Sequence, residues 1–155
     1  LAVLAADSCS DAVAAEPGRP ITLDAPEPVV VSGDTNHLRQ AIDNLVTNAL
    51  RHTRTGTPIE VAARLDGNGD GDGDDGEPRA VITVRDHGDG LNDVGLRHAF
   101  DRFWQASPSR SSVGAGLGLA IVAAIAAEHD GTASVANAPD GGAVFALKLP
   151  VGNRG

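Results

Sequence analysis

The chain has 155 residues, of which 41% are hydrophobic, so it is long enough for one globular domain with its own core. Its net charge of −9 argues against a nucleic-acid partner, and no apolar run approaches the roughly 20 residues that span a bilayer. The single cysteine, Cys9, cannot form an intrachain disulfide, which fits a reducing cytoplasm. We therefore expect a cytoplasmic domain that makes no direct contact with a membrane.

The elements follow from the spacing of apolar residues and from turn residues such as Pro17-Gly18. In chain order they are a helix over 1–16, strands at 21–23 and 29–31, a helix over 35–52, strands over 57–65 and 80–85, a short helix over 94–100, a helix over 115–128, and strands over 132–136 and 144–149. This order lacks regular βαβ alternation. It predicts an α/β fold, a two-layer sandwich with a mixed, mostly antiparallel sheet of about five strands and about three helices on one face.

A glycine cluster, Gly114-Ala115-Gly116-Leu117-Gly118, stands where a loop enters the helix over 115–128. Glycines let the backbone approach a ligand, and a helix start offers unpaired N–H groups to an anion. The cluster lacks the Gly-Lys-Ser/Thr of a P-loop and the βαβ setting of a dinucleotide site. It therefore fits either phosphate binding or a plain turn into a helix.

A second motif, Asp86-His87-Gly88-Asp89-Gly90, directly follows the strand over 80–85. A carboxylate at a strand end can accept a hydrogen bond from a ligand, and the glycines beside it leave room for a flat ring. An ordinary Asp-Gly turn explains the same residues.

The long helix carries Asn44, Asn48 and Arg51 on one face, because they are spaced four and three residues apart. An amide oxygen suits Mg²⁺, which takes one or two protein ligands and shares phosphate oxygens. Arg51 and His52 lie one turn onward, within reach of phosphates. A solvated helix face is the alternative, although two asparagines inside a helix are mildly unfavourable.

The order of these motifs resembles the N, G1, F and G2 boxes of histidine protein kinases, the sensor kinases of two-component systems. From N- to C-terminus the matching stretches are Asn44 to His52, Asp86-x-Gly88-x-Gly90, Phe100-Asp101-Arg102-Phe103-Trp104, and GAGLGLAI from Gly114. The resemblance implies the Bergerat ATP-binding fold, which DNA gyrase and mismatch-repair ATPases share. It also implies a catalytic domain over 17–155, a mobile ATP lid over 101–114, and a lead-in over 1–16 from an absent acceptor and dimerisation domain.

The resemblance further implies a role for each motif residue. Asp86 would bind the adenine amine, and Phe100 and Phe103 would anchor the lid or simply pack in the core. By position, the catalytic residues would be Asn48, which would also bind Mg²⁺, and Arg51, while ATP would contact Asn44, His52, Asp86, Gly88, Gly90, Gly114, Gly116, Leu117 and Gly118.

The implied reaction is transfer of the γ-phosphoryl group of ATP to a histidine. Members of the superfamily that hydrolyse ATP carry glutamate at the position of Asn44, and a neutral amide cannot act as a general base. No histidine of this chain has the family's acceptor context, His-Glu/Asp-Leu-Arg-x-Pro. We therefore expect the acceptor on another domain or chain, a response regulator further downstream, and a parent protein anchored in the bacterial membrane.

Three other interpretations fit parts of the sequence. A non-catalytic module that senses nucleotide would keep the same boxes, and an anti-sigma-factor kinase would keep the N and G boxes but not the FDRFW segment over 100–104. The Asp/Gly-rich segment over 66–78 matches the ligand pattern of an EF-hand calcium loop, including Gly71 and Glu77. An EF-hand needs flanking helices, whereas strands are predicted here, so a solvated hairpin insertion is favoured.

Overall fold

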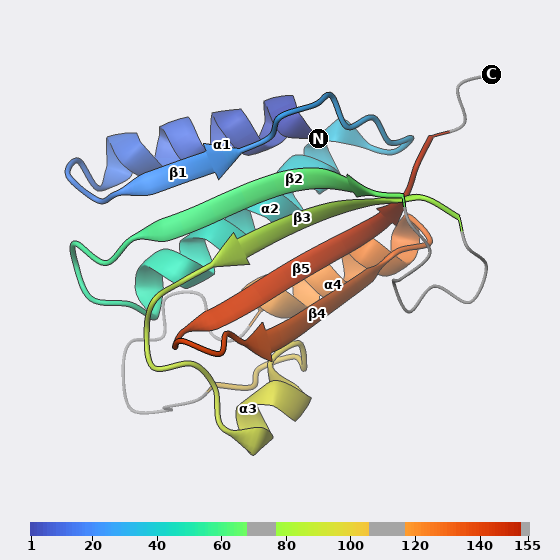
Figure 1. Ribbon diagram of the computed structural model, residues 1–155. Coiled ribbons are helices and arrows are strands. Elements are labelled where there is room, and N and C mark those ends of the chain that lie inside the picture. The colour runs from blue at the N-terminus through green and yellow to red at the C-terminus, as the bar shows by residue number, and fades with distance from the viewer. Residues whose placement is uncertain (68–76, 106–116, 153–155) are drawn as a thin grey trace.

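The computed structural model describes residues 1–67, 77–105 and 117–152 of the chain. These ranges form four helices and five strands (Figure 1). In chain order they are α1 (Ala2–Ala15), β1 (Ile21–Asp24), α2 (Thr35–Arg51), β2 (Ile59–Asp66), β3 (Arg79–Arg85), α3 (Asp93–His98), α4 (Gly118–Glu128), β4 (Thr132–Asn137) and β5 (Ala143–Pro150). All but one of the elements predicted from the sequence are present, with small shifts at their ends.

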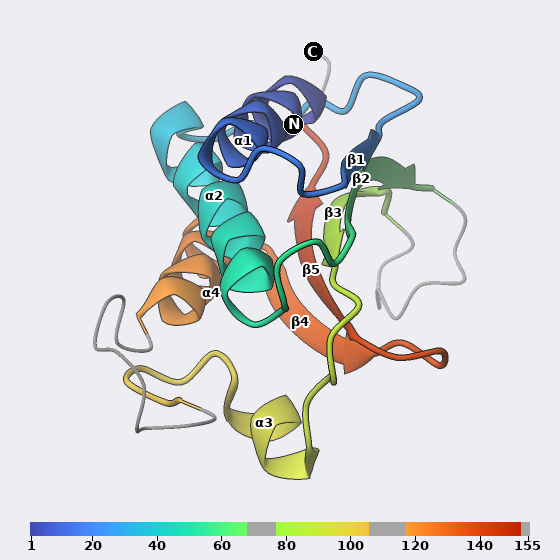
Figure 2. The ribbon, with the colours of Figure 1, turned by 90° about the vertical axis from the view of Figure 1, so that its left-hand side faces the viewer.

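One sheet contains all five strands in the order β1-β2-β3-β5-β4. β1 pairs with β2 in parallel, and the other three neighbouring pairs are antiparallel. Helices α1, α2 and α4 cover one face of the sheet, while α3 lies apart from them at one end of the molecule (Figure 1, Figure 2). The predicted two-layer sandwich with a mixed, mostly antiparallel sheet is therefore confirmed.

The core lies where alternate strand residues meet the apolar side of α2. β3 and β5 alternate between buried and half-buried residues, as expected of a sheet that is covered on one face. On α2, Leu38, Ile42 and Leu45 are each at most 3% exposed. Burial of each such side chain contributes about 1.5–3 kcal/mol, so the apolar stripe fixes the rotation of α2 about its axis.

The first turn of α2 is held by a cap and by the end of α4. The Asp34 carboxylate accepts a hydrogen bond from the His37 backbone N–H at 3.0 Å, and this bond lowers the pKa of Asp34. The Asp34 backbone N–H donates to His129 Nε2 at 3.1 Å, and His129 Nδ1 lies 2.8 Å from the Ile125 carbonyl oxygen. Because a carbonyl oxygen only accepts, the proton of this imidazole is on Nδ1.

Helix α1 contributes to the same core. Ala5 and Cys9 are buried against α2, and burial raises the pKa of the Cys9 thiol. Arg39 of α2 forms ion pairs with Asp7 and Asp11 of α1. Whether this helix also leads in from another domain stays a prediction.

The strand predicted at 29–31 is wrong. The segment is β-branched, but Pro26 and Pro28 before it supply no N–H for a ladder, and the structure gives it no strand. The Val29 side chain is 3% exposed, and its carbonyl oxygen accepts a hydrogen bond from the amino terminus of Leu1 at 2.6 Å. The apolar character of this segment therefore reflects burial of Val29 rather than strand pairing.

Leu45→Ala should lower the free energy of unfolding by about 2–5 kcal/mol, because Leu45 is fully buried between α2 and the sheet. Leu65→Ala is the matched control at a side chain that is 38% exposed, and it should cost less than about 1 kcal/mol. Urea unfolding of both variants measures the two losses. Equal losses would contradict the assignment of Leu45 to the core.

Candidate functional site

Asp86 lies immediately after β3 and is buried, with 5% of its surface exposed. Its backbone N–H donates to the carbonyl oxygen of Ala143 at 3.0 Å. Its carboxylate oxygen Oδ1 accepts hydrogen bonds from the backbone N–H of Gly88 at 3.0 Å and of Ala143 at 3.1 Å. Both described hydrogen bonds to this carboxylate therefore go to Oδ1, and Oδ2 is available to accept from a ligand.

Two glycines permit this arrangement. Gly90 has φ +74°, and a Cβ at this position would lie 2.7 Å from Asn137 Oδ1. Gly142 has φ +82°, and a Cβ there would lie 2.1 Å from the Asp86 carbonyl oxygen. Any side chain at Gly142 would therefore separate the start of β5 from Asp86. The sequence alone does not reveal this contact, since it joins segments that lie 56 positions apart in the chain.

Asn137 fixes the far end of the loop that begins at Asp86. Its side-chain Oδ1 accepts from the Leu91 backbone N–H at 2.8 Å, and its Nδ2 donates to the Leu91 carbonyl oxygen at 2.6 Å. This reciprocal pair copies the hydrogen bonds of a strand partner. Asn137 was not among the predicted site residues, because its contact with Leu91 joins positions that lie 46 residues apart.

The N-terminus of α4 begins beside Asn44. The Asn44 side-chain Nδ2 donates to the Gly118 carbonyl oxygen at 3.2 Å, so α2 and the start of α4 are joined. Leu117 precedes the helix, and within the described residues no side chain caps it. Its first backbone N–H groups are therefore suited to an anion. Gly114 and Gly116, which the sequence analysis assigned to the same site, lie outside the described residues.

Helix α2 links the two ends of the candidate site. Asn44 contacts α4, and the carbonyl oxygen of His52 lies close to Gly88, 3.4 Å from the position of a Cβ on that residue. These contacts are eight residues apart, which is about 12 Å along a helix. Asn48 is half-buried between them, and Arg51 is exposed at the end of the helix. The structure thus gathers the N, G1 and G2 motif residues that it describes around one helix.

The site offers amide oxygens rather than a preformed metal cage. In residues 1–67, 77–105 and 117–152 no group of three or more His, Cys, Asp or Glu side chains could hold a metal ion. Asn48 fits the other mode of Mg²⁺ binding, in which one or two protein ligands share the ion with phosphate oxygens. Most of the calcium-like segment, residues 68–76, lies outside the described residues, but β2 and β3 flank it, so the helices of an EF-hand are absent there.

The two phenylalanines of the F motif have different surroundings. Phe100 packs on the core, with its ring in a T-shaped contact with Phe145 at a centroid distance of 6.3 Å. Phe103 is 67% exposed at φ +64°, and the Arg102 guanidinium lies 5.7 Å from its ring centroid. Core packing therefore explains Phe100 but not Phe103.

The fold belongs to a known class of protein. A model of the family of histidine kinase-, DNA gyrase B- and HSP90-like ATPases matches residues 33–153. The chain therefore belongs to this ATPase family, and its curated relatives place it among the sensor histidine kinases. The Bergerat fold expected from the sequence is confirmed.

Three curated relatives illustrate the similarity. The sensor histidine kinase component HK1 of Mycobacterium tuberculosis is 41% identical over 133 residues, which is 86% of this chain and 72% of HK1. The histidine-protein kinase AfsQ2 of Streptomyces coelicolor is 42% identical over 84% of this chain, but the match spans only 22% of AfsQ2. The M. tuberculosis probable sensor histidine kinase TcrY is 40% identical over 96% of this chain and 30% of TcrY. The chain thus spans less than a third of two of these proteins.

Solved structures show the same architecture. The mycobacterial sensor histidine kinase MprB superposes with a TM-score of 0.81 at 24% identity, over 96% of this chain and 94% of that chain. The ATP binding domain of PrrB from M. tuberculosis has a TM-score of 0.72 at 30% identity, over 97% of this chain and 93% of that chain.

Within the described part of the chain, no helix is long and apolar enough to cross a membrane.

Gly142→Ala should destabilise the domain more than Gly141→Ala does. Both residues have positive φ, so either alanine costs about 1–2 kcal/mol in backbone strain. Only the Cβ at Gly142 would collide with Asp86, whereas nothing lies within 4 Å of a Cβ at Gly141, so we expect at least about 1 kcal/mol more. Thermal unfolding of the two variants measures the difference, and identical losses would argue against the close approach of β5 to Asp86.

Proposed function

We propose that this chain is the catalytic domain of a sensor histidine kinase, which binds MgATP and transfers the γ-phosphoryl group to a histidine on another domain or chain. The observation that carries the proposal is the buried Asp86 carboxylate, oriented through Oδ1 by two backbone N–H groups. It stands in a fold whose family consists of ATPases, at one end of a helix that carries Asn44 and Asn48.

Adenine would bind at Asp86. The exocyclic amine of adenine would donate to Oδ2, the oxygen that the described backbone donors leave available. Gly88 and Gly90 would let the ring approach the loop because they carry no side chains. A buried carboxylate that is left without a hydrogen-bond donor is costly. The site would therefore favour a base with an amine at this position over a base without one.

The phosphates would extend along α2 toward α4. Asn48 would bind Mg²⁺ with phosphate oxygens as its other ligands, and the ion would neutralise phosphate charge. Asn44 would support this arrangement by holding the start of α4 beside α2, as its hydrogen bond to the Gly118 carbonyl oxygen indicates. The backbone N–H groups that follow Leu117 would face the phosphates, together with those contributed by Gly114 and Gly116. Arg51 and His52 would add contacts from the exposed end of α2.

Transfer is favoured over hydrolysis by the chemistry of Asn44. A neutral amide has no basic site for removing a proton from water near neutral pH. An acceptor imidazole is largely unprotonated under the same conditions and needs less help from a base. The residues of this chain would therefore act by positioning the phosphates and by charge neutralisation.

The five histidines of this chain lack the sequence context of the family's acceptor, and four of them have partners within the domain. His37 contacts Glu128, His87 contacts Glu60, His98 contacts Asp101, and His129 bridges Ile125 and Asp34. The remaining one, His52, caps the end of α2 within the proposed site. The acceptor would therefore come from a histidine-bearing dimerisation domain, with a response regulator as the next recipient and a membrane-anchored parent protein.

Asp86→Asn should weaken binding of a non-hydrolysable ATP analogue with Mg²⁺ by about 100-fold. The two backbone N–H groups would retain the amide oxygen, so the amide NH₂ would face the adenine amine, donor against donor. Calorimetric titration measures the affinity, and Asp89→Asn is the matched control in an exposed position of the same loop. Undiminished binding by Asp86→Asn would contradict the assignment of Asp86 as the adenine-binding residue.

Asn48→Ala should reduce phosphoryl transfer to an added histidine-bearing domain by about 100-fold or more, because the metal loses its protein ligand. Asn36→Ala, in the exposed first turn of the same helix, should leave transfer unchanged. Radiolabel transfer from ATP measures both. Nucleotide binding without transfer in the unmodified protein would instead indicate a module that senses nucleotide.

A further inference from the structure

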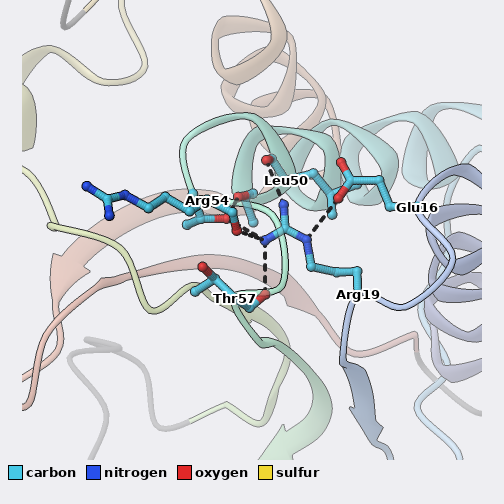
Figure 3. Close-up of polar contacts among 7 residues, drawn as sticks. Glu16, Arg19, Leu50, Arg54 and Thr57 are labelled. Carbon is cyan, nitrogen blue, oxygen red and sulfur yellow. Dashed lines mark hydrogen bonds and ion pairs between the residues drawn. The ribbon is translucent and has the colours of Figure 1, made fainter.

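Arg19 is a buried arginine that belongs to none of the sequence motifs. It lies between α1 and β1 and is 6% exposed, although arginine is almost never buried unless its charge is paired. Its Nε donates to Glu16 Oε2 at 2.9 Å. The rest of the guanidinium points toward the segment over 50–57, which joins the end of α2 to β2 (Figure 3).

The guanidinium holds this segment through several acceptors at once. It donates to Thr53 Oγ1 at 3.0 Å and to the carbonyl oxygens of Leu50, Arg54 and Thr57 at 3.1, 2.7 and 3.0 Å. The Leu50 carbonyl is among the last four of α2, which have no donor within the helix. A cation also interacts favourably with the negative end of the helix dipole. Arg19 therefore caps α2 from outside the helix.

Thr53 connects this cap to the candidate site. A Cβ on Gly88 would lie only 3.1 Å from Thr53 Cγ2, so the threonine methyl packs directly against the loop after β3. Gly88 in turn donates its N–H to Asp86 Oδ1. Two hydrogen bonds and the close approach of Thr53 to Gly88 thus connect Arg19 to Asp86.

We propose that Arg19 is a positioning residue for the nucleotide site, which holds the end of α2 against the loop over 86–90. This inference rests on the proposed function, because Arg19 would help to position Asp86 and Asn48 for the nucleotide that both would bind. Arg19 reaches these residues only through Thr53 and the end of α2. Lysine would keep the charge but not the planar fork that serves several acceptors, so it should replace Arg19 only in part.

The test compares Arg19→Met and Arg19→Lys with the control Arg64→Met, an exposed arginine of β2 that pairs with Asp24. Circular dichroism first identifies a temperature at which all the proteins are folded. At that temperature, the amide ¹H–¹⁵N signal of Gly88 in the nucleotide-free protein should shift in Arg19→Met. The signal of Gly131, which follows the C-terminal end of α4, should stay in place. The Kd for a non-hydrolysable ATP analogue with Mg²⁺ should rise about tenfold in Arg19→Met and less in Arg19→Lys.

A folded Arg19→Met with an unchanged Kd would overturn the proposal and leave Arg19 as a source of stability alone. If Arg19→Met does not fold, Arg19→Lys is judged by the same two measurements. If the unmodified chain binds no nucleotide, the proposed function fails for this chain, and the Gly88 signal alone decides whether Arg19 positions the loop. An unmoved Gly88 signal would then overturn the positioning role as well.

Discussion

The packing of α2 against the sheet is the constraint on which the rest of the molecule depends. Its apolar stripe, which includes Ile42 and Leu45, is fully buried, so the rotation of the helix about its axis is determined by the core. That rotation leaves Asn44 and Asn48 half-buried, with Asn44 hydrogen-bonded to the first residue of α4. Burial of the apolar stripe therefore both stabilises the domain and orients the polar residues of α2.

The ends of α2 are held by polar contacts that come from distant parts of the chain. At the N-terminus, the Asp34 backbone meets His129 at the end of α4, and at the C-terminus Arg19 meets the carbonyl oxygen of Leu50. Apolar contacts have little directional preference, so hydrogen bonds at the two ends add a directional constraint on the position of the helix. Hydrogen bonds at both ends oppose sliding of the helix along its axis, as the proposed site would require if Asn48 and Asp86 act on one nucleotide.

Sequence reasoning recovered what depends on local pattern. The helical period of apolar residues in α2 and their alternation in β3 and β5 are visible in the sequence. Sequence reasoning also recovered the order of motifs that indicated the fold family. It failed at residues 29–31, where β-branched residues were buried without a strand partner. It also could not find Arg19, Asn137 or the steric role of Gly142, since each acts on a segment that lies between 31 and 56 positions away. No periodicity marks such contacts, because they depend on how complete elements pack.

The orientation of the Asp86 carboxylate comes from main-chain donors, which has a consequence for how this domain can change through evolution. The N–H of Ala143 would be supplied equally by any residue except proline, so the identity of the side chain at that position is free as far as the carboxylate is concerned. Recognition of the base would thus depend on one carboxylate and on the conformation of the backbone around it. Surrounding residues other than Gly90 and Gly142 could then diverge widely without a change of ligand, and sequence identity between such domains would understate how similarly they recognise it.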